Sequence, residues 1–123
     1  MNINLDRTKL YYKSEEDKNL CDCEYCKNYY KNIKKAYPQI DEYLKNIGVD
    51  IEKPFETSPV DSEDGLIEYY MCQYIVFGRC PNDYRHIIDD IEIRIATSYP
   101  DTNINEEHFV LEIDCLKLNK NCV

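Results

Sequence analysis

The chain has 123 residues, of which 43% are hydrophobic and 32% are charged. This balance belongs to folded globular domains and excludes an intrinsically disordered chain. The formal net charge of −9 argues against nucleic acid and anionic lipid as partners, because like charges repel, but it permits a basic protein partner.

No apolar run is long enough to span a bilayer, so we expect no membrane partner. The first residues also lack the basic segment and the apolar stretch of a signal peptide. These two features predict a cytoplasmic protein.

The first half of the chain is predicted to be mainly helical, after a short strand at Leu10-Tyr11-Tyr12. One helix is indicated by side chains at alternating spacings of three and four, which share one helix face: Cys23, Cys26, Tyr30, Ile33 and Tyr37. Asn19 or Asp22 is placed to cap its start.

A second helix is predicted directly after the first. Pro38 breaks the first pattern and suits the first turn of a new helix, and Gly48 suits its end. The apolar stripe of this helix has four members: Ile40, Tyr43, Leu44 and Ile47.

After Gly48 the pattern changes to that of extended chain. Residues 49–52 alternate, Pro54 fits a sheet edge, and residues 61–65 contain the Asp-Gly pair typical of a hairpin turn. A long strand is predicted from Leu66 to Phe77, because this stretch is rich in β-branched and aromatic residues.

Two further strands are predicted beyond a loop at 78–83. Residues 87–95 alternate as one half-buried strand, and residues 99–103 form a loop. In the last strand one set of alternating side chains is expected to face the core: Phe109, Leu111, Ile113 and Cys115.

Consecutive strands without crossover helices should pair antiparallel, and their apolar face needs a cover. We therefore predict an α+β fold with two N-terminal helices packed on one face of a three- to five-stranded, mainly antiparallel sheet. The chain is expected to form a single domain over residues 1–123, helical over about 20–48 and strand-rich over about 49–118.

Seven cysteines cannot all pair within one chain, so thiols or metal ligands are favoured over a disulfide framework. Cys21, Cys23 and Cys26 lie within six residues, immediately before the helical pattern. One interpretation is a thiolate site for zinc or iron, because Cys-x-x-Cys is a common half-site. Its other half is undefined, since the remaining candidates are scattered: Cys72, Cys80, His86, His108, Cys115 and Cys122.

Two other interpretations of the cluster stay open. Cys23 and Cys26 share a stripe with Ile33 and can be core residues, as free cysteine is often buried. Alternatively, Cys21 or Cys23 is a reactive thiol, because the positive end of a helix dipole stabilises a thiolate, although acidic neighbours oppose this.

The predicted first helix also carries four lysines among aromatic residues: Lys27, Tyr29, Tyr30, Lys31, Lys34 and Lys35. Such interleaving can bind nucleic acid. A solvated helix face explains the pattern more simply, because the rest of the chain is acidic.

The segments 21–30, 48–54 and 74–78 resemble a family of small uncharacterised proteins from low-GC Gram-positive bacteria. The resemblance carried by Cys-x-Cys-x-x-Cys and Gly-Val-Asp-Ile-Glu-Lys-Pro implies a standalone bacterial domain. It implies no activity.

The sequence contains no recognisable catalytic constellation or cofactor motif, so no catalytic or cofactor-binding residue is predicted. The leading hypothesis is a small protein-interaction module that docks a partner through a polar sheet face or the basic helix, since tyrosine is enriched at interfaces. One alternative is a zinc or iron protein using Cys21, Cys23 and Cys26. A second is a cysteine-dependent redox or nucleophilic enzyme.

Overall fold

The computed structural model describes residues 1–14, 23–62 and 65–119. Three helices and six strands occupy these ranges, so the α+β class is confirmed, with three helices where two were predicted and six strands where three to five were predicted. The elements in chain order are β1 (Asn2–Ile3), α1 (Leu5–Ser14), α2 (Glu24–Ala36), α3 (Pro38–Asn46), β2 (Glu56–Asp61), β3 (Leu66–Arg79), β4 (Arg85–Ile88), β5 (Ile91–Ile95) and β6 (His108–Asn119).

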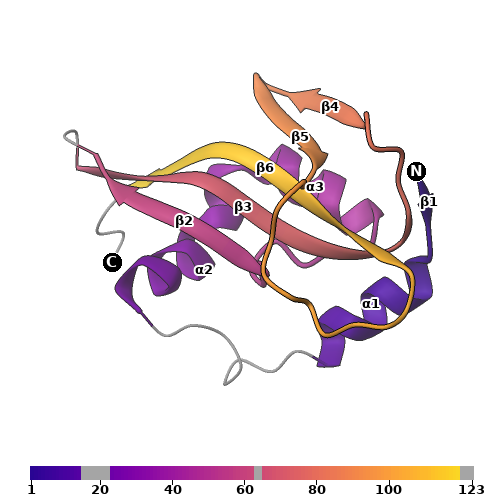
Figure 1. Cartoon of the computed structure of the whole chain (residues 1–123). Helices are drawn as coiled ribbons and strands as arrows, with labels where there is room; N and C mark the ends of the chain where they lie inside the picture. Colours follow the sequence, from indigo (N-terminus) through magenta and orange to yellow (C-terminus); the bar gives the residue numbers. More distant parts are fainter. Residues whose placement is uncertain (15–22, 63–64, 120–123) are drawn as a thin grey trace.

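The strands form one curled antiparallel sheet in the order β1-β3-β6-β5-β4, and β2 lies beside β3 as well. Figure 1 shows α2 and α3 behind the sheet, against the face that we call the inner face. The segment between β5 and β6 crosses in front of the opposite, outer face (Figure 1). Among the residues that the structure describes, none of the helices could span a membrane.

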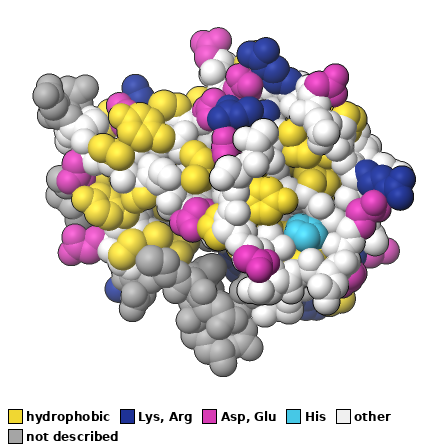
Figure 2. Space-filling model, in the orientation of Figure 1, with side chains coloured by type: hydrophobic (Ala, Val, Ile, Leu, Met, Phe, Trp, Pro, Cys, Tyr) yellow, Lys and Arg dark blue, Asp and Glu magenta, His cyan; other side chains and the backbone are white. Residues whose placement is uncertain are grey.

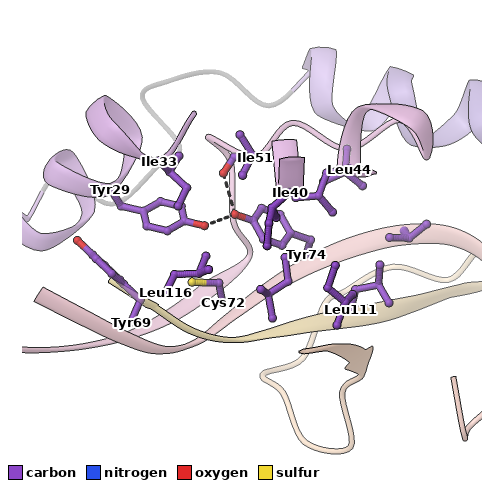
Figure 3. Packing of buried hydrophobic residues seen from close by; sticks show 14 of the residues in the cluster. Tyr29, Ile33, Ile40, Leu44, Ile51, Tyr69, Cys72, Tyr74, Leu111 and Leu116 are labelled. Carbon is purple, nitrogen blue, oxygen red and sulfur yellow. Dashed lines mark hydrogen bonds between the residues drawn. The ribbon is translucent and has the colours of Figure 1, made fainter. Parts of the chain in front are cut away.

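The main core lies between the inner face and the two helices. Tyr29 and Ile33 of α2 and Leu44 of α3 are fully buried against the sheet (Figure 3). Strands β3 and β6 supply most of the other side of this core: Ile67, Tyr69, Cys72, Tyr74, Val76, Phe109, Leu111, Ile113, Leu116 and Leu118.

Buried phenols link the helices to the sheet through hydrogen bonds. The Tyr74 hydroxyl donates to the Ile51 carbonyl at 2.7 Å, so its oxygen can accept from the hydroxyl of Tyr29 (Figure 3). The hydroxyl of Tyr69 in turn donates to the Tyr25 carbonyl in α2 at 2.5 Å. Burying a hydroxyl is costly unless it is paired, and these contacts meet that requirement.

The strand predicted at Leu10–Tyr12 is wrong, because these residues belong to α1. Asn4 caps this helix by accepting the Arg7 backbone N–H at 3.2 Å. Thr8 and Tyr12, four residues apart on one helix face, then satisfy the edge of β3: the Thr8 hydroxyl accepts the Phe77 N–H, and the Tyr12 hydroxyl donates to the Ile75 carbonyl. The helix therefore covers the part of that edge left open between β1 and β2.

Helices α2 and α3 are confirmed, with two differences in α2. Its buried face holds Tyr29 rather than Tyr30, so the stripe is rotated from the predicted one. Its N-cap is Cys23, whereas the predicted caps Asn19 and Asp22 lie outside the described residues. Helix α3 begins at Pro38 and ends just before Gly48, whose φ of +85° is the left-handed conformation expected at a helix stop.

The 49–52 segment is partly buried and is not a strand. Val49 and Ile51 are in the core, while Ile51 and Glu52 lie in a turn closed by a hydrogen bond from Lys53 N to Asp50 O. The predicted 61–65 hairpin is confirmed by the antiparallel pairing of β2 with β3, although residues 63–64 lie outside the described ranges.

The single strand predicted over residues 87–95 is wrong. It is a hairpin of β4 and β5, in which Ile88 pairs with Ile91 and the two intervening residues form the turn. Asp89 and Asp90 have φ values of +47° and +67°, the left-handed pair that a type I′ turn requires.

The prediction that Cys115 faces the core is also wrong. The side chain is exposed and the backbone φ is +52°, a left-handed value that reverses the alternation of β6. Beyond this point Leu116 and Leu118 face inward, in place of the residues in phase with Ile113.

A smaller core covers half of the outer face, where the β5–β6 segment lies over the sheet. It consists of Ile75 and Phe77 of β3 with Ala96 and Val110, and Tyr11 and Ile104 pack against it. The half of the outer face nearer the β2–β3 hairpin has no such cover among the described residues.

Candidate functional site

Two places in the described structure carry residues that suit a function: the start of α2, with its two cysteines, and the open half of the outer face. The cysteine prediction falls partly outside the described residues, because Cys21 and Cys122 lie there.

The core interpretation of the α2 cysteines is wrong for Cys23 and only partly right for Cys26. Cys23 is exposed and Cys26 is half-buried, whereas Cys72 on β3 is fully buried. Burial raises the pKa of the Cys72 thiol to about 12, as expected for a charge that would be removed from water. Cys72 is therefore a core residue.

The thiol of Cys23 caps α2. Its backbone is extended (φ −67°, ψ 161°), and its Sγ accepts the backbone N–H of Cys26 at 3.4 Å. This places the Cys23 sulfur over the positive end of a 13-residue helix, next to the backbone of Cys26.

Contacts on both sides hold this first turn of α2 to the sheet. The Tyr69 hydroxyl donates to the Tyr25 carbonyl, and the Tyr25 hydroxyl donates to Asp61 Oδ2 of β2 at 3.0 Å. The carboxylate of Asp61 raises the pKa of Tyr25, because it accepts the phenol proton and repels a phenolate. The two cysteines thus sit on a turn that β2 and β3 both anchor.

The other candidate metal ligands do not gather. In the described ranges, no group of three or more His, Cys, Asp or Glu side chains is arranged to hold a metal ion. His86 stacks on Tyr43 with 5.0 Å between ring centroids, and His108 is held by Thr102 Oγ1 and the Glu106 carbonyl. The thiolate metal hypothesis therefore depends on Cys21 and stays a prediction.

The basic face of α2 lacks exposed aromatic side chains. Lys27, Lys31 and Lys35 are exposed, but Tyr29 is fully buried and Tyr30 is half-buried. Stacking of bases requires accessible rings between the cations. The lysines are arranged as a solvated helix face.

A cavity of about 280 Å³ lies among the three helices, and three lysines line it, one from each helix: Lys9, Lys34 and Lys45. Acidic groups offset these cations, since Lys45 pairs with Asp41 at 3.2 Å and Lys34 with Glu52 at 3.8 Å. We assign no ligand to this cavity.

The open half of the outer face presents an apolar surface, which we call the Tyr70 patch. It comprises Val60 of β2, Tyr70 and Met71 of β3, and Cys115 of β6. Tyr70 is 50% exposed and Val60 is 44% exposed. Figure 2 shows apolar side chains gathered over this end of β2, β3 and β6.

Charged side chains border the patch. On one side, Lys117 Nζ lies 3.7 Å from Glu68 Oε1. On the other side, Arg94 pairs with Glu112 and Asp114. The neighbouring Glu68 carboxylate raises the pKa of Tyr70, by repelling the phenolate and accepting the phenol proton.

The Tyr70 patch was not among the sites predicted from the sequence. Tyr70 lies inside the predicted strand, where regular alternation places it on the face of the sheet opposite to that of Tyr69. Alternation alone does not mark it as part of a surface cluster. The one available signal was the pair of adjacent tyrosines, which puts an aromatic ring on each face of a strand.

No family model, no curated protein and no solved structure matches this chain.

Proposed function

We propose that this protein is a small interaction module whose Tyr70 patch binds a partner protein. The binding surface of that partner would have an apolar centre surrounded by basic residues. The observation that carries the proposal is the exposure of Tyr70 beside Val60, Met71 and Cys115 on a sheet face. Tyrosine and methionine are enriched at interfaces, and contiguous exposed apolar surface on a soluble protein often marks a binding site.

The fold supports this location, because within the described ranges one half of the outer face is covered and the other half is open. The covered half has its own small core of Ile75, Phe77, Ala96 and Val110 beneath the β5–β6 segment. The same strands continue into the Tyr70 patch. A partner on the patch would extend that covering layer along the sheet.

Charge complementarity supports a basic partner. Five acidic side chains lie on the strands around the patch, and three basic side chains pair with four of them: Glu56, Glu68, Glu92, Glu112 and Asp114, with Arg85, Arg94 and Lys117. The carboxylates outnumber these cations by two, so the border is acidic, as is the whole chain with its net charge of −9. Such a border accelerates the encounter with a basic partner and disfavours acidic ones.

The test is affinity capture from a lysate of the source organism with the wild type, Tyr70→Arg and a matched control, Tyr99→Arg. Tyr99 is 43% exposed but lies in the β5–β6 segment, outside the patch. We expect a basic protein to be captured by the wild type and the control and to be lost, by at least about tenfold, with Tyr70→Arg, since central aromatic residues dominate interface energies. Purified wild type should then bind that protein less tightly as salt is raised.

Equal capture by Tyr70→Arg, with the same melting temperature as the wild type, would refute the proposal. Repeated failure of the wild type to capture any protein would also count against it.

A further inference from the structure

The start of α2 supports a chemistry that is independent of the Tyr70 patch. We propose that Cys23 and Cys26 are a redox-active dithiol, which forms a reversible intramolecular disulfide by exchange with a small disulfide of the oxidised-glutathione class. The site consists of two thiols three residues apart, so it does not depend on one cysteine or on the helix end alone.

The backbone geometry suits a disulfide. Residues three apart on a helix have Cα atoms about 5 Å from each other, which falls inside the range that disulfides span. The N-cap Cys23 already directs its Sγ toward Cys26, since that sulfur lies 3.4 Å from the Cys26 backbone nitrogen. Side-chain rotation is then sufficient for bond formation, without movement of the helix.

The different exposure of the two cysteines determines which thiol reacts first with the external disulfide. Cys23 is exposed and can reach a disulfide in solution, whereas Cys26 is half-buried. A backbone N–H aimed at Sγ and the positive helix end both stabilise the thiolate of Cys23, which is the attacking form.

In the first step the Cys23 thiolate attacks one sulfur of the disulfide RSSR, whose S–S bond breaks and releases RS⁻. In the second step the Cys26 thiolate attacks the Cys23 sulfur of the mixed disulfide and releases the other RS⁻. The two protein thiols lose two protons and two electrons in total, and RSSR becomes two RSH. The reverse sequence, with two RSH as the reductant, restores the dithiol.

The surrounding contacts keep this turn in place during the exchange. Tyr69 and Asp61 bind its backbone and its Tyr25 side chain from two strands. None of the other described cysteines has a second described cysteine within three residues in the sequence. Cys72 is buried, Cys80 lies between β3 and β4, and Cys115 lies on β6. They serve as controls.

To test the proposal, the full chain is equilibrated anaerobically with mixtures of reduced and oxidised glutathione. The samples are then quenched with acid and alkylated, and peptide mapping identifies the disulfides formed. We expect a Cys23–Cys26 link whose fraction depends on the square of the thiol concentration over the disulfide concentration. Diluting total glutathione at a fixed ratio should therefore increase it, whereas a mixed disulfide would depend on the ratio alone.

The variants assign the roles. Cys26→Ser should trap glutathione on Cys23, Cys23→Ser should abolish the link, and both Cys21→Ser and Cys115→Ser should retain it. Circular dichroism checks that each variant is folded. A link that requires Cys21, glutathione bound only as a mixed disulfide, or bound zinc that protects the thiols until a chelator is added would each overturn the proposal.

Discussion

Tyr70 of β3 and Cys115 of β6 interrupt the pairing of the two longest strands at the same step. The residues on either side are paired, Tyr69 with Leu116 and Met71 with Asp114, so the register is the same before and after the interruption. Nevertheless, the alternation of inward-facing and outward-facing side chains shifts by one residue in both strands at this step. The two strands change phase together.

This shared irregularity creates the Tyr70 patch. At the step where the phase changes, Tyr70 and Cys115 are both exposed, while their neighbours Tyr69 and Leu116 are buried. The register between β2 and β3 also shifts by one residue nearby, between Thr57 and Pro59. Bulges of this kind redirect side chains and are frequent near functional sites.

The left-handed backbone at Cys115 predicts an unusual response to glycine. Relief of roughly 1–2 kcal/mol of strain should exceed the entropic cost of glycine, about 0.4–1 kcal/mol, so Cys115→Gly should stabilise the fold by about 0.5 kcal/mol. Cys115→Val should destabilise it by about 1 kcal/mol, because β-branched residues fit this φ poorly.

Lys117→Gly is the matched control, at an exposed position of the same strand with ordinary φ, and should cost about 0.5–1 kcal/mol. Urea unfolding of the three variants under reducing conditions measures the differences. A loss of stability in Cys115→Gly equal to that of the control would contradict the assigned strain.

The sequence predicted the fold class because helical periodicity dominates Ile40 to Ile47, and β-branched and aromatic residues mark Leu66 to Phe77 as a strand. It could not predict the phase change at Cys115, because a strand with one irregular residue has the same composition as a regular one. It also missed α1, whose Thr8 and Tyr12 are explained by their contacts with the edge of β3.

For the candidate sites, too, the sequence predicted local features but not those that depend on strand pairing. The spacing of Cys23 and Cys26 is local, so the sequence placed both at a helix start, although it could not tell which would be exposed. The Tyr70 patch combines residues from three strands, and only their pairing brings Val60 and Cys115 beside Tyr70.

The turn between β4 and β5 provides a second stability prediction. Both Asp89 and Asp90 have positive φ, for which Asn-Gly is the preferred pair. Asp90→Gly should therefore stabilise the hairpin by about 0.5–1 kcal/mol, and Asp90→Val should destabilise it by a similar amount. Amide hydrogen exchange of Ile88 and Ile91, which flank the turn, reports on this hairpin directly, and faster exchange in Asp90→Gly would count against the type I′ assignment.

The buried phenols predict that two similar variants differ in stability. Tyr74→Phe removes the donor to the Ile51 carbonyl and leaves that buried oxygen unsatisfied, which should cost about 1–3 kcal/mol. Tyr29→Phe leaves this bond intact and should cost only about 0.5–1.5 kcal/mol. Chemical denaturation of both variants gives the comparison, and a larger loss for Tyr29→Phe would show that the donor order is the reverse.

The same buried groups predict how stability changes in alkali. Burial raises the pKa of Tyr29 and Tyr74 well above the ordinary value of 10.0, and it raises the pKa of Cys72 from 9.0 to about 12. In the unfolded chain Cys72 therefore loses its proton above about pH 9 and the two phenols above about pH 10, while in the folded protein all three stay protonated. The folded state then binds more protons than the unfolded state, so the free energy of unfolding must fall as pH rises.

Each of these groups should contribute a slope of about 1.4 kcal/mol per pH unit once the pH exceeds its unfolded-state pKa. Urea unfolding with a thiol reductant at pH values below and above this range measures the slope. Replacing Tyr29 by phenylalanine should reduce this slope by the contribution of one phenol above about pH 10. An equal slope in the wild type and Tyr29→Phe would mean that the Tyr29 phenol is not what resists ionisation in the core.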